Sequence, residues 1–422
     1  MTLTSKNTPE LANSTAGILR RLNRWLAQNA IRTCNLFFEI LVASLFQSDA
    51  CPQPKDVLVL RSSAIGDFIC CLPALTSLRR RFPESKIHLL TTPTANPKLW
   101  AQDIIPGAPI LAGTNLVDDV LLFYGRDIMS PHKIRALRAR IRDFDPEQTF
   151  LVPQSGERVS GILKKILFLR ILGVHRNLSG YHLTKTLSFF KKTQFTDGGY
   201  DHQVTSALIS VGGGKCESVT FPIYINHESV ACVDKIWRET GLDNVPFIIG
   251  LFPGGKFEHK RWPVERFQAL CNSFNKEAEV AFVIVGGEAE QFQARQLVAA
   301  CSKPIVDFSG KTNLIETAEV LHRCHLYIGN DSGPAHIAAA MGTPCVTLFS
   351  SVLFPGFWEP WGERNIAIRH RVPCEYCFNE SHCPTGTMDC VKGISVEEVL
   401  DAARKFFPES AITTSGQIGI RP

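Results

Sequence analysis

The chain has 422 residues, and this length predicts two domains rather than one. Hydrophobic residues make up 45% of it, charged residues make up 20%, and the 30 glycines and 25 prolines follow no period. This composition excludes collagen-like, coiled-coil and largely disordered chains. The formal net charge of +5 permits an anionic ligand but is far from the balance of a nucleic-acid-binding domain, so no nucleic-acid partner is expected.

The 14 cysteines are spread along the chain except near its C-terminal end. A chain of this size does not need disulfides in order to fold, so free thiols in a reducing compartment are expected. The cysteine pattern therefore predicts a cytoplasmic protein.

The sequence pattern of residues 1–50 predicts an amphipathic extension at the N-terminal end of the chain. Within Ile18–Phe46, four arginines precede an apolar run of 13 residues, which is too short for a membrane span of ~20 residues and begins too far from Met1 for a signal peptide. Apolar residues recur at helical spacing opposite the arginines, as in a helix that lies on an anionic membrane. We therefore expect peripheral attachment to the inner face of the cytoplasmic membrane. The alternative is a helix packed on its own domain.

Short apolar runs then alternate with amphipathic stretches, which predicts parallel sheets covered by helices on both faces. In the first half, strands are expected at Val57–Arg61, Ile87–Thr91, Asp119–Phe123 and Thr149–Val152, and helices near Phe68–Arg81, Lys133–Arg142 and Arg158–Leu172. In the second half, strands are expected at Phe247–Leu251, Val280–Val285, Ile305–Phe308, Leu326–Ile328 and Cys345–Phe349, and helices near Val230–Thr240, Val264–Phe274, Glu288–Ala300, Leu314–Arg323, Pro334–Met341 and Val396–Phe407.

The pattern predicts an α/β chain with two Rossmann-like domains, at residues 51–226 and 227–407, and a tail at 408–422. Such folds bind ligands outside the carboxyl ends of their strands, so the site is expected in the cleft between the two domains.

The first motif follows the first strand and reads Arg61-Ser62-Ser63-Ala-Ile-Gly66-Asp67. Small polar residues, a glycine and an acid at a helix start place Asp67 at the floor of the cleft, beside backbone amides that suit an anion. The neighbouring candidate residues are Arg61, Ser62, Ser63 and Gly66. The alternative is that Asp67 only caps the helix. A lone glycine also fails the Gly-x-Gly-x-x-Gly fingerprint, which weakens a dehydrogenase interpretation.

The second motif is a glycine-rich turn after a strand, followed by cations. Gly254 lets the backbone approach a diphosphate, and the cations Lys256, Lys260 and Arg261 can neutralise it. The alternative is a solvated basic loop.

The third motif, Gly329-Asn-Asp331-Ser332-Gly333-Pro-Ala-His336, joins a strand to a helix of small residues. It predicts a second anion site at a helix N-terminus, where Asp331 and His336 orient oxygens of a sugar or phosphate. Between these motifs, Glu290 offers a carboxylate for a ribose diol. The alternatives are a capped turn with a core-facing histidine, and a surface glutamate.

These motifs together resemble glycosyltransferase family 9, the heptosyltransferases of lipopolysaccharide core synthesis. The family's R-x-S-x-I-G-D segment is matched by Arg61 to Asp67, and its K-R-W-P segment by Lys260 to Pro263. Its strongest signature, G-N-D-S-G-x-x-H-x-A-A-A-x-G-x-P, is matched from Gly329 to Pro344 without a gap.

The resemblance implies a GT-B fold and an inverting transfer of a sugar from a nucleotide donor that requires no metal or other cofactor. It implies that Asp67 is the general base, that its neighbours in the first motif lie on the acceptor side, and that Lys260 contacts the donor diphosphate. By the same resemblance, Ser332, Gly333 and His336 bind phosphate and sugar, Asp331 holds the sugar hydroxyls, and Glu290 meets the adenosine ribose.

The expected partners are a nucleotide-sugar donor, ADP-heptose above others, and a lipid-linked glycan acceptor such as the lipopolysaccharide inner core. The N-terminal extension and the loosely matching stretch Asp143–Tyr181 depart from the family pattern and leave the acceptor open. The alternatives are another nucleotide sugar, a nucleotide-sugar epimerase, and a non-catalytic sugar-nucleotide-binding module.

The loop at residues 373–391 holds four cysteines and a histidine within 17 residues. This density is typical of a metal site, although the spacing C-x₂-C-x₅-C-x₆-C is not that of a standard zinc finger. A structural metal or a disulfide is one interpretation and free thiols are the other. The candidate ligands are Cys374, Cys377, Cys383 and Cys390.

Overall fold

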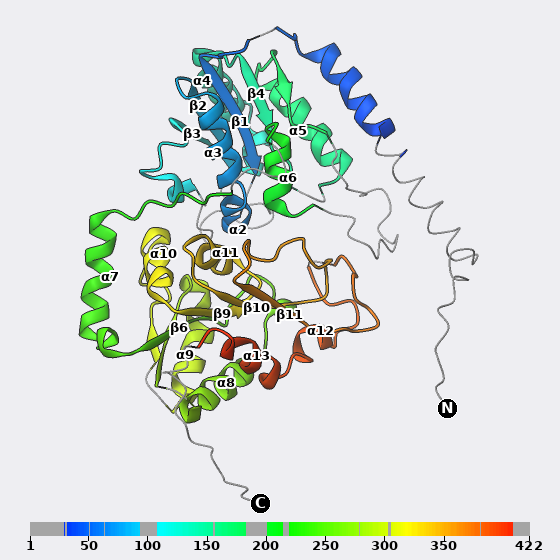
Figure 1. Ribbon diagram of the computed structural model, residues 1–422. Helices are drawn as coiled ribbons and strands as arrows, with labels where there is room; N and C mark the ends of the chain where they lie inside the picture. The colour runs from blue at the N-terminus through cyan, green and yellow to red at the C-terminus, as the bar shows by residue number, and fades with distance from the viewer. Residues whose placement is uncertain are drawn as a thin grey trace, which may run out of the picture.

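A computed structural model describes most of the chain in two lobes (Figure 1). The described residues are 29, 32–49, 51–62, 64–92, 108–154, 157–182, 201–213, 219–277, 279–302, 305–379 and 381–407. Part of the predicted N-terminal extension and the whole tail at 408–422 lie outside them.

The first lobe is built on a parallel sheet with the strand order β3-β2-β1-β4-β5. Its strands are β1 (Asp56–Ser62), β2 (Lys86–Thr92), β3 (Asp119–Leu122), β4 (Gln148–Leu151) and β5 (Leu178–Ser179). Its helices are α2 (Ile65–Ile69), α3 (Leu72–Arg81), α4 (Pro131–Phe144), α5 (Val159–Ile171) and α6 (Gln203–Ser210), with short 3-10 turns η2 (Ala108–Leu111) and η3 (Gly125–Met129).

The second lobe is built on a parallel sheet with the strand order β11-β10-β9-β6-β7-β8. Its strands are β6 (Phe247–Phe252), β7 (Val280–Ile284), β8 (Ile305–Asp307), β9 (Leu326–Asn330), β10 (Cys345–Phe349) and β11 (Asn365–Arg369). Its helices are α7 (His227–Glu239), α8 (Val264–Glu277), α9 (Gln291–Ala300), α10 (Leu314–Arg323), α11 (Gly333–Ala340), α12 (Asp389–Lys392) and α13 (Val396–Arg404), with 3-10 turns η4 (Leu242–Asn244), η5 (Glu258–Lys260) and η6 (Glu288–Glu290).

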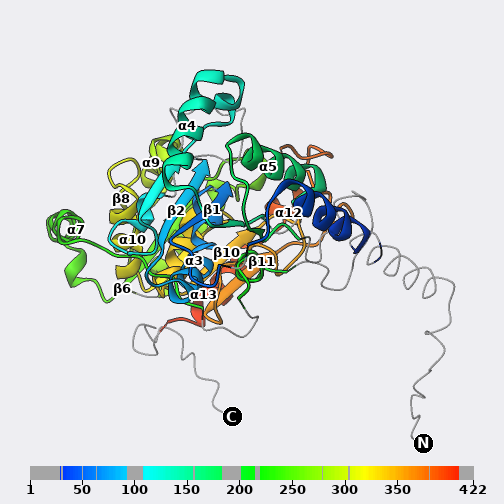
Figure 2. The same ribbon diagram turned by 90° about the horizontal axis from the view of Figure 1, so that it is seen from above.

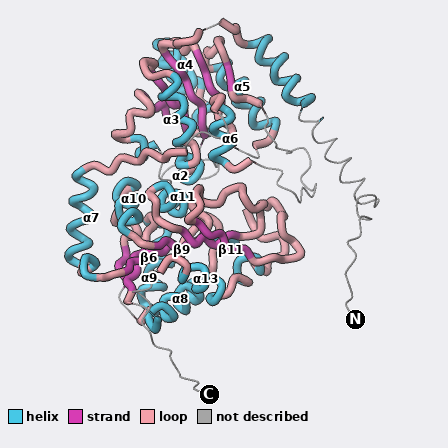
Figure 3. Tube along the Cα trace, viewed as in Figure 1, coloured by secondary structure: helices cyan, strands magenta, loops and turns pink. Residues whose placement is uncertain are grey.

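Both sheets begin at an interior strand and grow outward in two directions, so the prediction of two Rossmann-like halves is confirmed. Figure 3 shows the two sheets as separate groups of strands, one in each lobe. The alternation of strand side chains explains the layers, because Val57 and Val59 pack on the side of α3 and α6, whereas Leu58 and Leu60 pack on the side of α5.

A continuous cluster of buried apolar side chains joins the lobes. It runs from α3 in the first lobe to α10 and α11 in the second, and it includes Leu72, Leu75, Leu321 and Ile337. The layer formed by α10 and α11 therefore faces the first lobe, while α8, α9 and α13 cover the far side of the second sheet (Figure 1).

The helix predicted at Phe68–Arg81 is wrong as a single element. The chain forms α2, turns at Cys70 and Cys71, and starts again as α3. Pro73 stands in the first turn of α3, where its missing N–H is tolerated, but it could not continue a helix that began before it. The break separates α2 from α3, and α2 lies between the lobes (Figure 1).

The N-terminal helix, residues 32–45, packs on the first lobe beside α5. Phe38, Val42 and the following Phe46 are buried in the same cluster as Ile162 and Ile166 of α5. The alternative interpretation of this segment, a helix packed on its own domain, therefore holds for one face of it. Within the described chain, no helix has the length and apolar character needed to cross a bilayer.

Candidate active site between the two lobes

The loops that carry the three motifs follow the strands at which each sheet changes direction. In the first lobe, β1 is paired with β2 on one side and β4 on the other; in the second lobe, β6 is paired with β7 and β9. In such sheets the loops after the two central strands diverge and leave a crevice at their carboxyl ends. Asp67 follows β1, Gly254 follows β6 and Asp331 follows β9.

Asp67 is held by residues from both central strands of the first lobe. Its Oδ1 accepts a hydrogen bond of 2.7 Å from Nε2 of Gln154, which follows β4, and its Oδ2 accepts one of 3.1 Å from the backbone N–H of Ala64. The contact with Ala64 is a helix cap, so the alternative interpretation of Asp67 as a capping residue is correct for Oδ2. The first contact joins the ends of β1 and β4 at the carboxylate.

Arg61 brings a buried positive charge to the same place. Its side chain is 1% exposed, and Nη2 lies 3.8 Å from Oδ1 of Asp67. The guanidinium also donates to the backbone carbonyls of Val152 and Asp67, at 3.2 and 3.3 Å. Because a buried charge needs a partner, this arrangement favours the ionised form of the carboxylate.

Gly66 and Gly333 allow α2 and α11 to meet across the lobes. A Cβ at Gly66 would lie 2.8 Å from Cδ2 of His336, and a Cβ at Gly333 would lie 3.1 Å from the side chain of Ile65. A residue with a side chain at Gly66 would therefore force the two helices apart. The glycine predicted on the acceptor side acts by permitting this close approach.

His336 is buried at this helix contact. Its Nδ1 lies 3.7 Å from Sγ of Cys70, and the ring of Trp358 stands edge-on to it at 6.1 Å. Burial, with a smaller contribution from His202, lowers the pKa of His336 to about 3. The imidazole is therefore neutral near pH 7, and its predicted contact with a phosphate would be a hydrogen bond and not an ion pair.

Asn330 organises the loops of the second lobe, although sequence reasoning did not select it. Its side-chain NH₂ donates to the carbonyls of Pro253 and Gly254 at 2.9 and 2.8 Å, and its Oδ1 accepts from the backbone N–H of Trp262 at 2.9 Å. One buried amide thus ties the end of β9 to the glycine turn after β6 and to the basic segment. The side-chain amide of Asn330 therefore fixes the shape of this part of the crevice.

The three predicted cations lie along this basic segment. The ammonium groups of Lys256 and Lys260 lie over the ring of Phe257, at 5.3 and 5.9 Å from its centroid. Nε of Arg261 donates to the carbonyl of Gly255 at 2.7 Å, which folds the turn back on itself. The structure therefore brings the two lysines to one aromatic ring, while Arg261 holds the loop.

Glu290 lies directly against the glycine turn. A Cβ at Gly254 would collide with Cγ of Glu290, so the glycine makes room for this side chain. One carboxylate oxygen accepts a hydrogen bond of 2.9 Å from the backbone N–H of Gly287, in the manner of a helix cap. A carboxylate has a second oxygen that can accept from a further donor such as a hydroxyl.

Asp331 and Ser332 stand where β9 turns into α11. Ser332 is the N-cap residue of α11, and its side chain makes no capping hydrogen bond to that helix. Burial raises the pKa of the Cys70 thiol, and the charges of Asp67 and Asp331 raise it further. Two carboxylates from different lobes are therefore close enough to act on the same thiol.

Some predicted residues cannot be placed. Ser63 lies outside the described residues, and Ser62 is described only as the last residue of β1. Gln154 was missed because it follows β4, far from any motif. The only signal in the sequence was its position just after an expected strand.

The four cysteines of the 373–391 loop share one neighbourhood. Burial raises the pKa of the Cys390 thiol, and the charges of Cys383, Cys374 and Cys377 raise it further. All four are free thiols, and among the residues that the structure describes no three His, Cys, Asp or Glu side chains are arranged to hold a metal. The structural metal stays a prediction.

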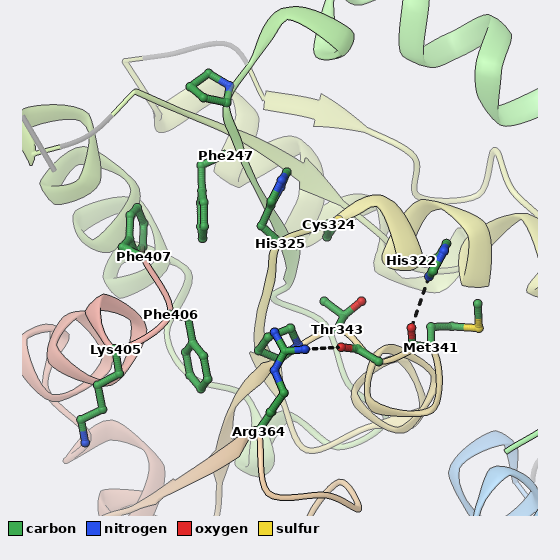
Figure 4. A pocket seen from close by; sticks show the side chains of 13 residues that line it. Phe247, His322, Cys324, His325, Met341, Thr343, Arg364, Lys405, Phe406 and Phe407 are labelled. Carbon is green, nitrogen blue, oxygen red and sulfur yellow. Dashed lines mark hydrogen bonds between the residues drawn. The ribbon is translucent and has the colours of Figure 1, made fainter. Parts of the chain in front are cut away.

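A separate cavity of about 560 Å³ lies at the opposite edge of the second sheet. Phe247, His325 and Arg364 line it from the amino ends of β6, β9 and β11, together with Phe407 beyond α13 (Figure 4). None of the candidate site residues lines this cavity, and only the end of the family signature, from Met341 to Pro344, reaches it. Because sheets of this type bind their substrates at the carboxyl ends of the strands, it is not the donor site.

Comparison with known proteins identifies the arrangement. Residues 225–387 match the model of glycosyltransferase family 9 (heptosyltransferase). Lipopolysaccharide heptosyltransferase 3 of Escherichia coli is 24% identical over 376 residues, which cover 82% of this chain and 96% of that protein.

Two solved structures share the fold. A family 9 glycosyltransferase from Veillonella parvula has a TM-score of 0.65 at 20% identity, covering 85% of this chain and 99% of that one. The E. coli ADP-heptose lipopolysaccharide heptosyltransferase II has a TM-score of 0.58 at 17% identity, covering 83% and 98%. The expected GT-B fold is confirmed, and the chain is a glycosyltransferase whose second lobe matches family 9.

Proposed function

We propose that the protein transfers heptose from ADP-heptose to a lipid-linked glycan, such as the inner core of lipopolysaccharide, with inversion at the anomeric carbon. The observation that carries the proposal is that a held carboxylate, Asp67, follows the central strand β1 of the first sheet, while a glycine turn and two lysines follow the central strand β6 of the second. The two Escherichia coli proteins named above are lipopolysaccharide heptosyltransferases, which supports this donor and this acceptor class.

Asp67 serves as the general base in this proposal. It takes the proton of the acceptor hydroxyl as that oxygen attacks the anomeric carbon from the face opposite the leaving diphosphate. Gln154 and Arg61 support this role, since one orients Oδ1 and the other favours the ionised carboxylate. The bond from the sugar to the diphosphate breaks as the new glycosidic bond forms.

The departing ADP is stabilised by the second lobe. Lys260 and Lys256 supply positive charge for the diphosphate, and the N-terminus of α11, with Ser332 and Gly333, supplies backbone amides. Glu290 holds the adenosine ribose and Asp331 the sugar hydroxyls. These groups replace the metal ion that many transferases use, so we propose that transfer needs no metal.

We further propose that the enzyme works at the cytoplasmic face of the inner membrane, where its acceptor is anchored. Every cysteine in the described part of the chain is a free thiol, which suits a reducing compartment. The N-terminal helix buries one face in the lobe and leaves Leu36, Phe37 and Ile40 exposed on the other. A peripheral enzyme needs such a face, because its acceptor does not leave the bilayer.

The test is mass spectrometry of donor and acceptor after incubation of the full chain with ADP-heptose, with and without a core acceptor that lacks the sugar. The expected result is an acceptor heavier by one heptose, and ADP released only when acceptor is present. Isomerised donor without acceptor would indicate an epimerase. Bound but unchanged donor would indicate a binding module, and transfer from a different nucleotide sugar would correct the donor.

A further inference from the structure

Exposed apolar side chains gather on two neighbouring helices of the first lobe. Leu36, Phe37 and Ile40 lie on the N-terminal helix, and Leu167 and Ile171 lie on α5; each is between 43% and 63% exposed. The two helices lie side by side in both views of the ribbon, and their inner faces share one buried cluster (Figures 1 and 2). Their outer faces therefore form one surface, which we call the two-helix face.

The charge of this face is positive. Arg32, Lys164 and Arg170 are exposed on the same two helices, and in the described chain none of the three pairs with a carboxylate. The acids on or next to these helices have partners of their own: Glu39 of the N-terminal helix lies 3.2 Å from His182, and Glu157, which precedes α5, lies 2.7 Å from Lys165. Three further arginines, at positions 20, 21 and 24, precede the helix in the sequence.

The face also has a fixed relation to the crevice. The loop between β4 and α5 carries Gln154, which binds Asp67, so α5 begins at the edge of the sheet that carries the candidate base. A flat partner that binds along α5 would lie next to the first-lobe side of the crevice, where the acceptor is expected. This position suits a partner in which the acceptor is anchored, because the acceptor then stays close to Asp67.

We propose that the two-helix face docks the enzyme on an anionic lipid bilayer, with the five apolar side chains entering the headgroup region and the three cations contacting lipid phosphates. Apolar residues ringed by Lys and Arg are the signature of a surface that lies in the membrane interface. The inference rests on the proposed lipid-linked acceptor. The proposal extends the membrane-docking surface from the N-terminal segment to α5. It also fixes how the crevice is oriented relative to the bilayer.

The test is cosedimentation of the full chain with vesicles of phosphatidylcholine alone and with added phosphatidylglycerol. The double variant Leu167→Gln, Ile171→Gln keeps helix-compatible residues and removes apolar area from α5 only. It should bind mixed vesicles at least about 10-fold more weakly than the natural chain. Phe292→Gln, which removes a similarly exposed side chain from α9 of the second lobe, should bind like the natural chain.

The charge contribution is tested by Lys164→Gln with Arg170→Gln, which should weaken binding to mixed vesicles and leave the weak binding to neutral vesicles unchanged. Circular dichroism and transfer to a short soluble acceptor should match the natural chain for all variants. Unchanged vesicle binding by the α5 variants would overturn the proposal. The proposal would also be overturned if analytical ultracentrifugation showed that the natural chain is a dimer and these variants are monomers. The two-helix face would then join two copies of the chain.

The outcome separates this proposal from the proposed function. A chain that transfers heptose to soluble acceptor but does not bind vesicles keeps its function and loses this docking surface. A chain that binds vesicles through α5 but transfers no sugar keeps the surface and loses the function.

Discussion

The side-chain amide of Gln154 donates a 2.7 Å hydrogen bond to Oδ1 of Asp67, 87 residues away in the chain. The two residues follow β4 and β1, the strands at which the first sheet changes direction. The contact therefore depends on the topology of the sheet. It fixes the orientation of the carboxylate and favours its charged form.

We expect Gln154→Leu to lower kcat roughly 10-fold, because one hydrogen bond to the charged base is lost. The acid limb of the rate profile should also move to higher pH, since the ionised carboxylate loses a donor. The measurement is the dependence of kcat on pH. Gln148→Leu is the matched control, because Gln148 lies at the other end of β4 and bonds to Asn177 and Ser179. If the acid limb of the pH dependence of kcat is the same in Gln154→Leu as in the natural chain, Gln154 does not act on the ionisation of Asp67.

Lys260→Ala should weaken the binding of ADP about 10-fold or more, because a charge-assisted contact to a phosphate is worth roughly 1.5 to 3 kcal/mol. Calorimetric titration with ADP measures this change. Lys392→Ala, an exposed lysine on α12, should bind ADP like the natural chain. Equal affinities in the two variants would place the diphosphate elsewhere.

Acid should destabilise the protein through His336. Burial lowers the pKa of this residue from 6.5 to about 3, so between these values the unfolded chain holds a proton that the folded chain does not. The stabilisation is present above pH 6.5 and is lost as the pH falls, by up to about 1.4 kcal/mol for each pH unit. His336→Gln should lack this loss. Urea unfolding at pH 7 and pH 5 measures it; the same acid sensitivity in both proteins would show that His336 titrates normally.

Removal of metal should not affect transfer. Dialysis against EDTA is expected to leave the rate unchanged, because Lys256, Lys260 and the N-terminus of α11 supply the positive charge for the diphosphate. A requirement for added magnesium would contradict this. Elemental analysis of the purified protein tests the separate prediction at Cys374, Cys377, Cys383 and Cys390, for which one bound metal per chain is the positive result.

The strands and most helices could be predicted because buried parallel strands are short apolar runs, as in Phe247–Phe252, where every residue is buried. The break between α2 and α3 was missed because the apolar period continues through Cys70 and Cys71, and only Pro73 marks the restart. The strand β11 was missed because its residues are only partly buried and carry no continuous apolar run.

Within the candidate site, the sequence could place residues that share a loop, such as Lys260 and Arg261. It could not show Asn330 bonding to Gly254, because that contact joins strands β9 and β6 across 76 positions of the chain. Nor could it show that His336 points at α2 of the other lobe, since the packing of two lobes leaves no local pattern.

The most direct test of the central claim compares Asp67→Asn with the natural chain in transfer and in donor binding. The replacement keeps the size of the side chain and removes the base. Turnover of ADP-heptose with core acceptor should fall by ~10²- to 10⁴-fold, while the affinity for donor, measured by calorimetry, should stay the same because Asp67 faces the acceptor. Equal turnover in the two proteins would remove Asp67 from the chemistry and contradict the proposed mechanism.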